Sequence, residues 1–279
     1  MLTASFPNIV RMKTIRFKSF SSGSCGNCYF IGTEEDGRTH GILIDAGVSP
    51  RRLKKELLAE GMSFDDIDAI LITHDHLDHI RSLGSYCKHV SKPVFSTPTL
   101  MKALAGHFIT GEYLGPCRRE LLPEWNRINE DICVRYFVVP HDATQTVGFA
   151  ISLDGHRYVH ITDCGCMTDE AVEWCRQADT IVLESNYDID MLVHGPYPKE
   201  LQDRIMGGYG HLSNDECAGV LRKVNHDGLE RVFLCHLSEH NNTPFLALKS
   251  AATAFVSSEN KPRVVPLPRE SASPMFTLR

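Results

Sequence analysis

The stretch Leu71-Ile72-Thr73-His74-Asp75-His76-Leu77-Asp78-His79-Ile80 decides the fold. It brings three histidines and two aspartates together directly after a short apolar run. Such a run, opening onto a polar cluster, predicts a buried strand that ends in a loop. His74 and His76 then lie on one side of an extended segment. Asp78 and His79 follow at the turn into the next element, where they can face a second point in space.

These side chains predict a metal centre. Imidazole nitrogens and carboxylate oxygens are ligands for divalent zinc, manganese and iron. Because a single tetrahedral ion does not need so many donors, the spacing indicates two divalent ions side by side, with further ligands elsewhere in the chain. Zn²⁺ is the expected metal, and Mn²⁺ or iron would accept the same donors.

The composition of the 279-residue chain is that of a globular protein, with 42% hydrophobic and 23% charged residues. Its net charge of −6 gives no global indication of a nucleic-acid partner. A polyanion would therefore be attracted by a local patch or by bound metal. The ten cysteines form no dense disulfide framework, and no apolar run reaches the roughly 18 residues of a membrane span. We therefore expect a cytoplasmic protein with no membrane partner.

An apolar strand followed by a polar side chain is a pattern that recurs along the chain. The residues that follow such strands include Asp45, His141, Asp163, Glu184 and His236. A rigid sheet holds residues at strand ends while leaving them accessible. No linker or fixed repeat interrupts the series. We therefore expect a single domain over residues 12–279, with residues 1–11 as a loose N-terminal arm.

Other segments predict the elements around these strands. Helical spacing and capping residues indicate helices around residues 50–60, 98–108, 168–178, 196–206, 213–224 and 244–257. Glycine and serine predict a turn over residues 21–28.

The order and setting of these motifs resemble the metallo-β-lactamase fold. The five motifs are Asp45, the central stretch, His141, Asp163 and His236, and the resemblance spans roughly residues 15–260. It implies an α/β protein with a four-layer αββα sandwich, in which two β-sheets pack face to face with helices outside. It also implies a two-metal site at one edge of the sandwich.

The resemblance further implies a role for each motif residue. One ion would be bound by His74, His76 and His141, and the other by Asp78, His79 and His236, with Asp163 bridging them. Asp45 would orient ligands by hydrogen bonds without binding metal. Two ions of this kind activate a water and clamp the attacked and leaving oxygens of a displacement. Asp78 also counts among the expected catalytic residues.

Finer segments resemble the YycJ/WalJ (VicX) subfamily over nearly the whole chain. They are residues 20–28, 184–188, 195–198, 210–214 and 235–242. The resemblance implies a hydrolase of phosphodiester bonds, acting as a 5′-to-3′ exonuclease on double-stranded DNA with a role in mismatch repair. DNA is then the expected partner.

Several assignments stay open at this point. His211 is a candidate for protonating the leaving group or contacting phosphate, yet it could equally be a residue at the start of a helix capped by Ser213 or Asn214. Ser185, Asn186 and Asn214 are candidate substrate contacts. Two alternative functions are a small-molecule (cyclic) phosphodiesterase and a metal-containing regulatory protein linked to two-component signalling.

Overall fold

The computed structural model describes residues 5–7 and 13–278. The predicted N-terminal arm therefore lies largely outside the described residues. Within it, the Phe6 ring packs against the rings of Trp125 and Trp174, with centroids 5.5 and 5.2 Å apart. At Phe6 the chain is in contact with the body of the protein.

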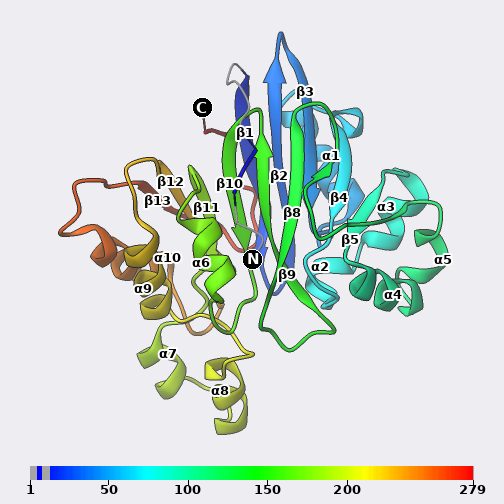
Figure 1. Cartoon of the computed structure of the whole chain (residues 1–279). Coiled ribbons are helices and arrows are strands. Elements are labelled where there is room, and N and C mark those ends of the chain that lie inside the picture. The colour runs from blue at the N-terminus through cyan, green and yellow to red at the C-terminus, as the bar shows by residue number, and fades with distance from the viewer. Residues whose placement is uncertain (1–4, 8–12, 279) are drawn as a thin grey trace.

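The described strands form two sheets of seven (Figure 1). The first sheet has the order β14 (Phe276–Thr277), β1 (Thr14–Gly23), β2 (Gly26–Glu35), β3 (Arg38–Ile44), β4 (Ile67–Leu71), β5 (Val94–Ser96) and β6 (Arg118–Glu120). The second has the order β13 (Arg263–Pro266), β12 (Arg231–Cys235), β11 (Thr180–Glu184), β10 (His156–Ile161), β9 (Thr146–Leu153), β8 (Ile132–Val139) and β7 (Asn126–Arg127).

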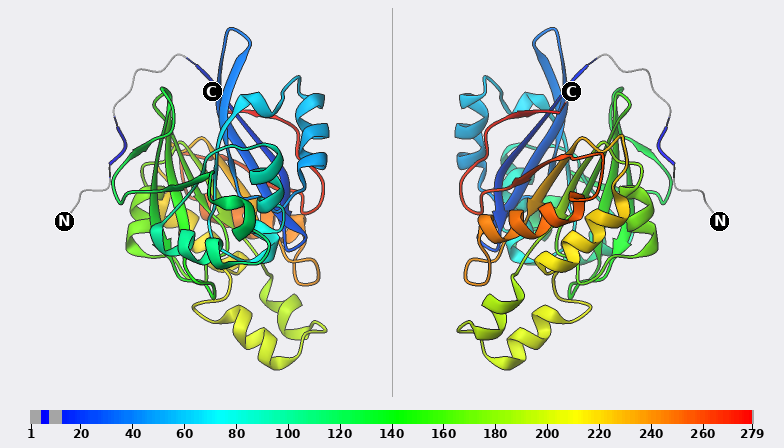
Figure 2. Two further views of the ribbon diagram at one scale, coloured as in Figure 1. Left: turned by 90° about the vertical axis from the view of Figure 1, so that its right-hand side faces the viewer. Right: turned by 90° about the vertical axis from the view of Figure 1, so that its left-hand side faces the viewer.

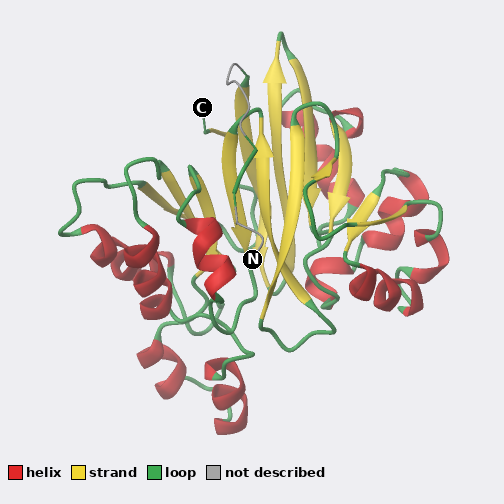
Figure 3. Cartoon of the chain, viewed as in Figure 1, coloured by secondary structure: helices red, strands yellow, loops and turns green. Residues whose placement is uncertain are grey.

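Helices cover the outer face of each sheet (Figures 2 and 3). Those following the strands of the first sheet are α1 (Pro50–Ala59), α2 (Leu77–Ile80), α3 (Leu83–His89), α4 (Pro98–Gly106) and α5 (Gly111–Leu114), with the 3₁₀ turn η1 (Phe64–Asp66). Those following the strands of the second sheet are α6 (Asp169–Cys175), α9 (Asn214–Val224) and α10 (Pro244–Ala252), with η2 (Thr253–Phe255). Two further helices, α7 (Ile189–His194) and α8 (Lys199–Met206), project from the base of the sandwich (Figure 1).

Three buried apolar clusters hold the layers together. The central cluster lies between the sheets, where the rings of Phe17 on β1 and Phe233 on β12 are 4.5 Å apart. A second cluster joins the first sheet to helices through Leu53 and Leu100, and a third joins the other sheet to helices through Trp174. Burial of apolar surface on both faces of each sheet explains the near-continuous apolar strands. The predicted four-layer αββα sandwich is confirmed.

The predicted turn over residues 21–28 is much shorter than expected. Ser21, Ser22 and Gly23 continue β1, and Gly26 already begins β2, so the turn is confined to Ser24 and Cys25. The polar side chains in these strands are buried because they are hydrogen-bonded; for example, the Ser22 hydroxyl accepts from the backbone N–H of His236 at 2.9 Å. This extended hairpin brings the first sheet up to the predicted site.

Candidate metal centre

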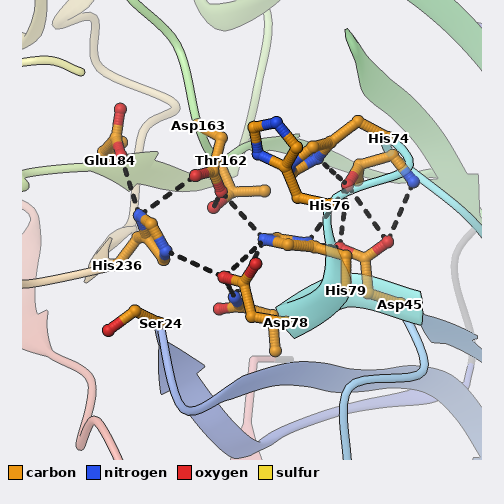
Figure 4. Close-up of polar contacts among 12 residues, drawn as sticks. Ser24, Asp45, His74, His76, Asp78, His79, Thr162, Asp163, Glu184 and His236 are labelled. Atoms are coloured by element: carbon orange, nitrogen blue, oxygen red, sulfur yellow. Dashed lines mark hydrogen bonds and ion pairs between the residues drawn. The ribbon is translucent and has the colours of Figure 1, made fainter. Parts of the chain in front are cut away.

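The predicted ligands converge at one edge of the sandwich (Figure 4). His74 follows β4, and Asp78 and His79 lie on α2, directly beyond it. His141, Asp163 and His236 follow β8, β10 and β12 of the other sheet. At this edge, four groups have potential ligand atoms that lie within 4.8 Å of one another: His74, His76 and His141; His74, His79 and Asp163; Asp78, His79 and His236; and Asp163, Glu184, His211 and His236. The structure therefore brings all seven predicted ligands together.

The backbone at three site residues is in the left-handed region. The φ angles are 63° at Asp45, 47° at Asp163 and 53° at His236. Non-glycine residues adopt this conformation uncommonly, and it clusters at functional sites because the surrounding structure holds it there. Each of these residues ends a strand, so the sharp turn directs its side chain along the sheet edge toward the others.

A glycine fixes the loop after β3 against α2. A Cβ on Gly47 would lie 1.8 Å from the carbonyl oxygen of Asp78, so no larger residue fits there. The backbone N–H of Ala46 donates to the carbonyl of His79 at 2.7 Å. This close approach sets the position of α2, and with it the side chains of Asp78 and His79.

Asp45 sits at the centre of a buried hydrogen-bond network. Nδ1 of His79 donates to its Oδ2 at 2.7 Å, and the hydroxyl of Thr73 donates to Oδ2 at 2.9 Å. The Thr73 oxygen in turn lies 3.0 Å from Nδ1 of His74. Asp45 thus anchors one ring nitrogen of His79 directly and one of His74 through Thr73. This geometry agrees with the orienting role predicted for Asp45.

The remaining ring nitrogens point into the space between the ligands. Nδ1 of His141 donates to the carbonyl of Gly210 at 2.8 Å, which leaves Nε2 directed toward the site. The buried Nε2 of His74 has no hydrogen-bond partner among the described residues, and that of His236 faces Oδ2 of Asp78 at 3.5 Å. An unpaired buried nitrogen is costly unless something else binds it. The donor set therefore fits divalent metal ions.

The protonation states of His74, His141 and Asp163 also favour the binding of cations. Burial and the neighbouring imidazole of His79 lower the pKa of His74 well below its ordinary value. Burial likewise lowers the pKa of His141. Burial opposes ionisation of Asp163, but the imidazoles of His236 and His79 outweigh it and hold the Asp163 pKa well below its ordinary value. Neutral imidazoles and an ionised carboxylate are the forms that bind metal.

His236 and His79 have more carboxylates as neighbours than the histidines discussed above. Burial opposes protonation of His236, but Asp163, Asp78 and Glu184 outweigh it and raise the His236 pKa to about 10. Burial also opposes protonation of His79, but the carboxylates of Asp45, Asp78 and Asp163 outweigh it and raise the His79 pKa well above its ordinary value. Because a ligand imidazole must be neutral, metal binding at these two histidines requires the loss of protons.

Glu184 is a site residue that the sequence analysis placed at a strand end without giving it a role. Its side chain is fully buried at the end of β11. Oε1 accepts from Nδ1 of His211 at 2.7 Å and from Nδ1 of His236 at 3.0 Å. Oε2 accepts from the backbone N–H of Cys164 at 2.9 Å and of Leu212 at 3.1 Å. Glu184 therefore fixes both histidines and the loops that carry them.

His211 lies beside the metal-ligand cluster, and the cap of the following helix is another residue. The first helical residue of α9 is Asn214, and Ser213 caps it in a capping box with Glu216. Burial lowers the pKa of His211, but the carboxylates of Glu184 and Asp163 outweigh it and raise that pKa above its ordinary value. With Nδ1 bound to Glu184, its Nε2 is the ring atom left to meet a substrate.

The three predicted substrate contacts have different surroundings. Ser185 and Asn214 are buried, and the Ser185 hydroxyl donates to Oδ1 of Asn214 at 2.6 Å. Asn242 closes this network with bonds to both the Asn214 side chain and the Ser185 carbonyl. Asn186 lines the cavity beside the cluster and donates to the carbonyl of His236 at 2.8 Å. The side chains of Ser185 and Asn214 are thus engaged with each other, whereas Asn186 faces the cavity, and the substrate contacts stay a prediction for all three.

Fold and site define a metal-dependent hydrolase, and the chain belongs to the beta-lactamase superfamily, whose domain model matches residues 40–237. It is 30% identical to exodeoxyribonuclease YycJ of Bacillus anthracis, over 85% of this chain and 88% of that protein. It is 28% identical to exodeoxyribonuclease WalJ of Streptococcus pneumoniae, over 83% of this chain and 85% of that protein.

A solved structure supports the fold assignment. The metallo-β-lactamase fold protein YhfI from Bacillus subtilis superposes with a TM-score of 0.67 at 16% identity, covering 94% of this chain and 99% of that chain. The predicted family and its YycJ/WalJ resemblance are confirmed. No helix in the described part of the chain has the length and hydrophobicity needed to cross a membrane.

Proposed function

We propose that the protein is a two-metal exonuclease that removes nucleotides from the 5′ end of double-stranded DNA. The observation that carries the proposal is the convergence of seven imidazole and carboxylate side chains in a chain similar to two exodeoxyribonucleases over most of its length. The 5′-to-3′ direction and a contribution to mismatch repair belong to the same proposal and rest on the subfamily resemblance.

The proposed ligand assignment rests on the family resemblance and is supported by the clustering of these side chains. His74, His76 and His141 would hold one ion, and Asp78, His79 and His236 the other, with Asp163 shared between them. Bound metals would supply an activated water and neutralise charge on the phosphodiester. Zn²⁺ is the proposed metal, with Mn²⁺ or iron as the alternatives that this donor set accepts.

Side chains of the protein itself act on the leaving oxygen. Glu184 holds Nδ1 of His211, which sets the direction of the imidazole and stabilises its charged form. Nε2 of His211 then gives a proton to the oxygen that leaves phosphorus. Asp78 contributes through its carboxylate, which Asn27 holds by a hydrogen bond of 3.0 Å to Oδ2.

Free thiols support a reducing location. All ten cysteines are unpaired, and most are buried. Structural disulfides are typical of oxidising compartments and rare in the cytoplasm. We therefore place the protein in the cytoplasm, where its DNA substrate would be available.

The test compares a duplex labelled at the 5′ end with one labelled at the 3′ end. The proposal predicts early release of labelled mononucleotide from the first and gradual shortening of the second. Hydrolysis of bis-p-nitrophenyl phosphate with both duplexes left intact would favour the small-molecule phosphodiesterase. Bound metal without hydrolysis of any diester would favour the regulatory role.

A further inference from the structure

A cavity of about 330 Å³ opens beside the metal-ligand cluster. His211 and His236 form its inner end. Its sides come from α8 and from residues 237–240, which follow β12. Figure 1 shows α7 and α8 projecting from the base of the sandwich, away from both sheets. This helical projection adds a wall to one side of the site.

The chemistry of the walls suits an uncharged ring more than a second phosphate. Tyr197, Leu201 and Ile205 provide an aromatic ring and aliphatic surface. The charged members are already paired, because Arg204 bonds to Asp142 and Glu239 accepts from Arg269 at 2.9 Å. Tyr197 is half-buried, and its ring meets that of His240 edge-on with centroids 6.0 Å apart.

Neutral hydrogen-bonding groups complete the cavity. Ser24, Asn186 and Ser238 line it on the side of the cluster. Figure 4 shows Ser24 at the tip of the hairpin, close to His236 and Asp78. Hydroxyl and amide groups of this kind bind sugar hydroxyls and base edges, whereas stacking of a base needs an aromatic face such as that of Tyr197.

We propose that this cavity binds the 5′-terminal nucleoside of the strand being degraded, with its base against Tyr197. The proposal rests on the exonuclease function proposed above. The position of His211 decides which side of the scissile bond occupies the cavity. His211 lies in the cavity wall and, in the proposed reaction, protonates the leaving oxygen. When a water oxygen bonds to phosphorus, the bond from phosphorus to the 3′ oxygen of the terminal nucleoside breaks, and that oxygen takes the proton. The released unit is therefore the one in the cavity.

The size of the cavity limits what it can hold. Its volume lies at the lower end of small-molecule sites, which span about 300–1,000 Å³. One nucleoside fits such a space, so each turnover should release a mononucleotide.

The experiment uses two duplexes labelled at the 3′ end of the attacked strand. One has a normal 5′-terminal thymidine, and the other has a tetrahydrofuran residue that keeps the sugar and phosphate but lacks the base. Metal-loaded wild type is compared with Tyr197→Ala and Tyr197→Phe. Phe108→Ala serves as a matched control, since Phe108 is an exposed aromatic far from the cavity on the segment between α4 and α5.

Wild type should remove the normal terminal nucleotide about 10-fold faster, in kcat/KM, than the abasic one. Tyr197→Ala should lose this difference. Its kcat/KM on both ends should equal that of wild type on the abasic end. Tyr197→Phe and Phe108→Ala should retain it. Equal rates on both ends for wild type, or a Tyr197→Ala variant that slows both ends by one factor, would overturn the proposal. Failure of wild type to shorten either duplex would instead refute the exonuclease function itself.

Discussion

Nδ1 of His79 lies 2.7 Å from Oδ2 of Asp45, and both side chains are fully buried. The aspartate comes from the end of β3 and the histidine from α2, which follows β4, so the contact joins two neighbouring strand ends. A carboxylate behind a histidine in this way fixes the ring orientation and makes the other nitrogen a better ligand. The strength of metal binding should therefore depend on a residue that binds no metal.

Replacing Asp45 with asparagine tests this dependence. Asp45→Asn keeps the shape but removes the charge, so the affinity for metal should fall about 10- to 100-fold. Competition with a chromophoric chelator measures it. Asp36→Asn is the matched control, because Asp36 is an exposed aspartate that also has a positive φ, at the tip of the β2–β3 hairpin. Unchanged affinity in Asp45→Asn would contradict the orienting role.

Replacing His211 should affect substrates according to their leaving groups. His211→Ala removes the proton donor, so kcat on DNA, which has a poor alkoxide leaving group, should fall about 10²- to 10⁴-fold. The good leaving group of bis-p-nitrophenyl phosphate needs little protonation, so the loss there should be much smaller. Parallel loss on both substrates, with metal content unchanged, would show that His211 does not act as the acid.

Replacing Ser185 should affect stability more than activity. Its buried hydroxyl donates to Asn214 at 2.6 Å, and Asn214 keeps its bond to Asn242 when that hydroxyl is lost. Ser185→Ala should therefore lower the free energy of unfolding by about 1 kcal/mol. Urea denaturation of the metal-loaded protein measures this change. A large rise in KM for DNA at unchanged stability would instead support the prediction that Ser185 contacts the substrate.

Asp179, which directly precedes β11 at the end of that strand opposite to the site, should make stability depend on pH. Burial raises the pKa of Asp179, but hydrogen bonds from Arg157 outweigh it and hold that pKa below its ordinary value. A lowered pKa means that this stabilisation is present above the unfolded pKa and is lost as the pH falls through the folded pKa. The difference in unfolding free energy between wild type and Asp179→Asn should shrink from pH 6 toward about pH 3. If the difference in unfolding free energy between the two proteins stayed constant across that pH range, the lowered pKa of Asp179 could not be the cause of the pH dependence.

The fold and the clustering of the candidate metal ligands could be predicted because they depend on local patterns. Each ligand follows a short apolar strand, and neighbouring strand ends of a sheet meet in space whatever the intervening sequence. The helices near residues 50–60, 98–108 and 213–224 carry their own capping residues, and the structure places α1, α4 and α9 there.

The remaining site residues depend on contacts between distant segments. Glu184 meets histidines 27 and 52 residues further along the chain, so its role follows from packing and not from local sequence. Ser185 is polar and close to the site, yet Asn214 and Asn242 draw it into a buried network. The Gly/Ser-rich segment after Phe20 resembles a turn in composition, but hydrogen bonds to Tyr29 and His236 hold Ser22 within paired strands.

The most direct test of the account is metal-dependent release of nucleotides from duplex DNA. Chelator-treated protein should leave a 5′-labelled duplex intact, and activity should return in proportion to added Zn²⁺ or Mn²⁺, reaching its maximum at two equivalents. His76→Ala, which removes one predicted ligand, should bind less metal and show little recovery. Degradation of the duplex by metal-free protein, or full recovery in His76→Ala, would contradict the two-metal nuclease.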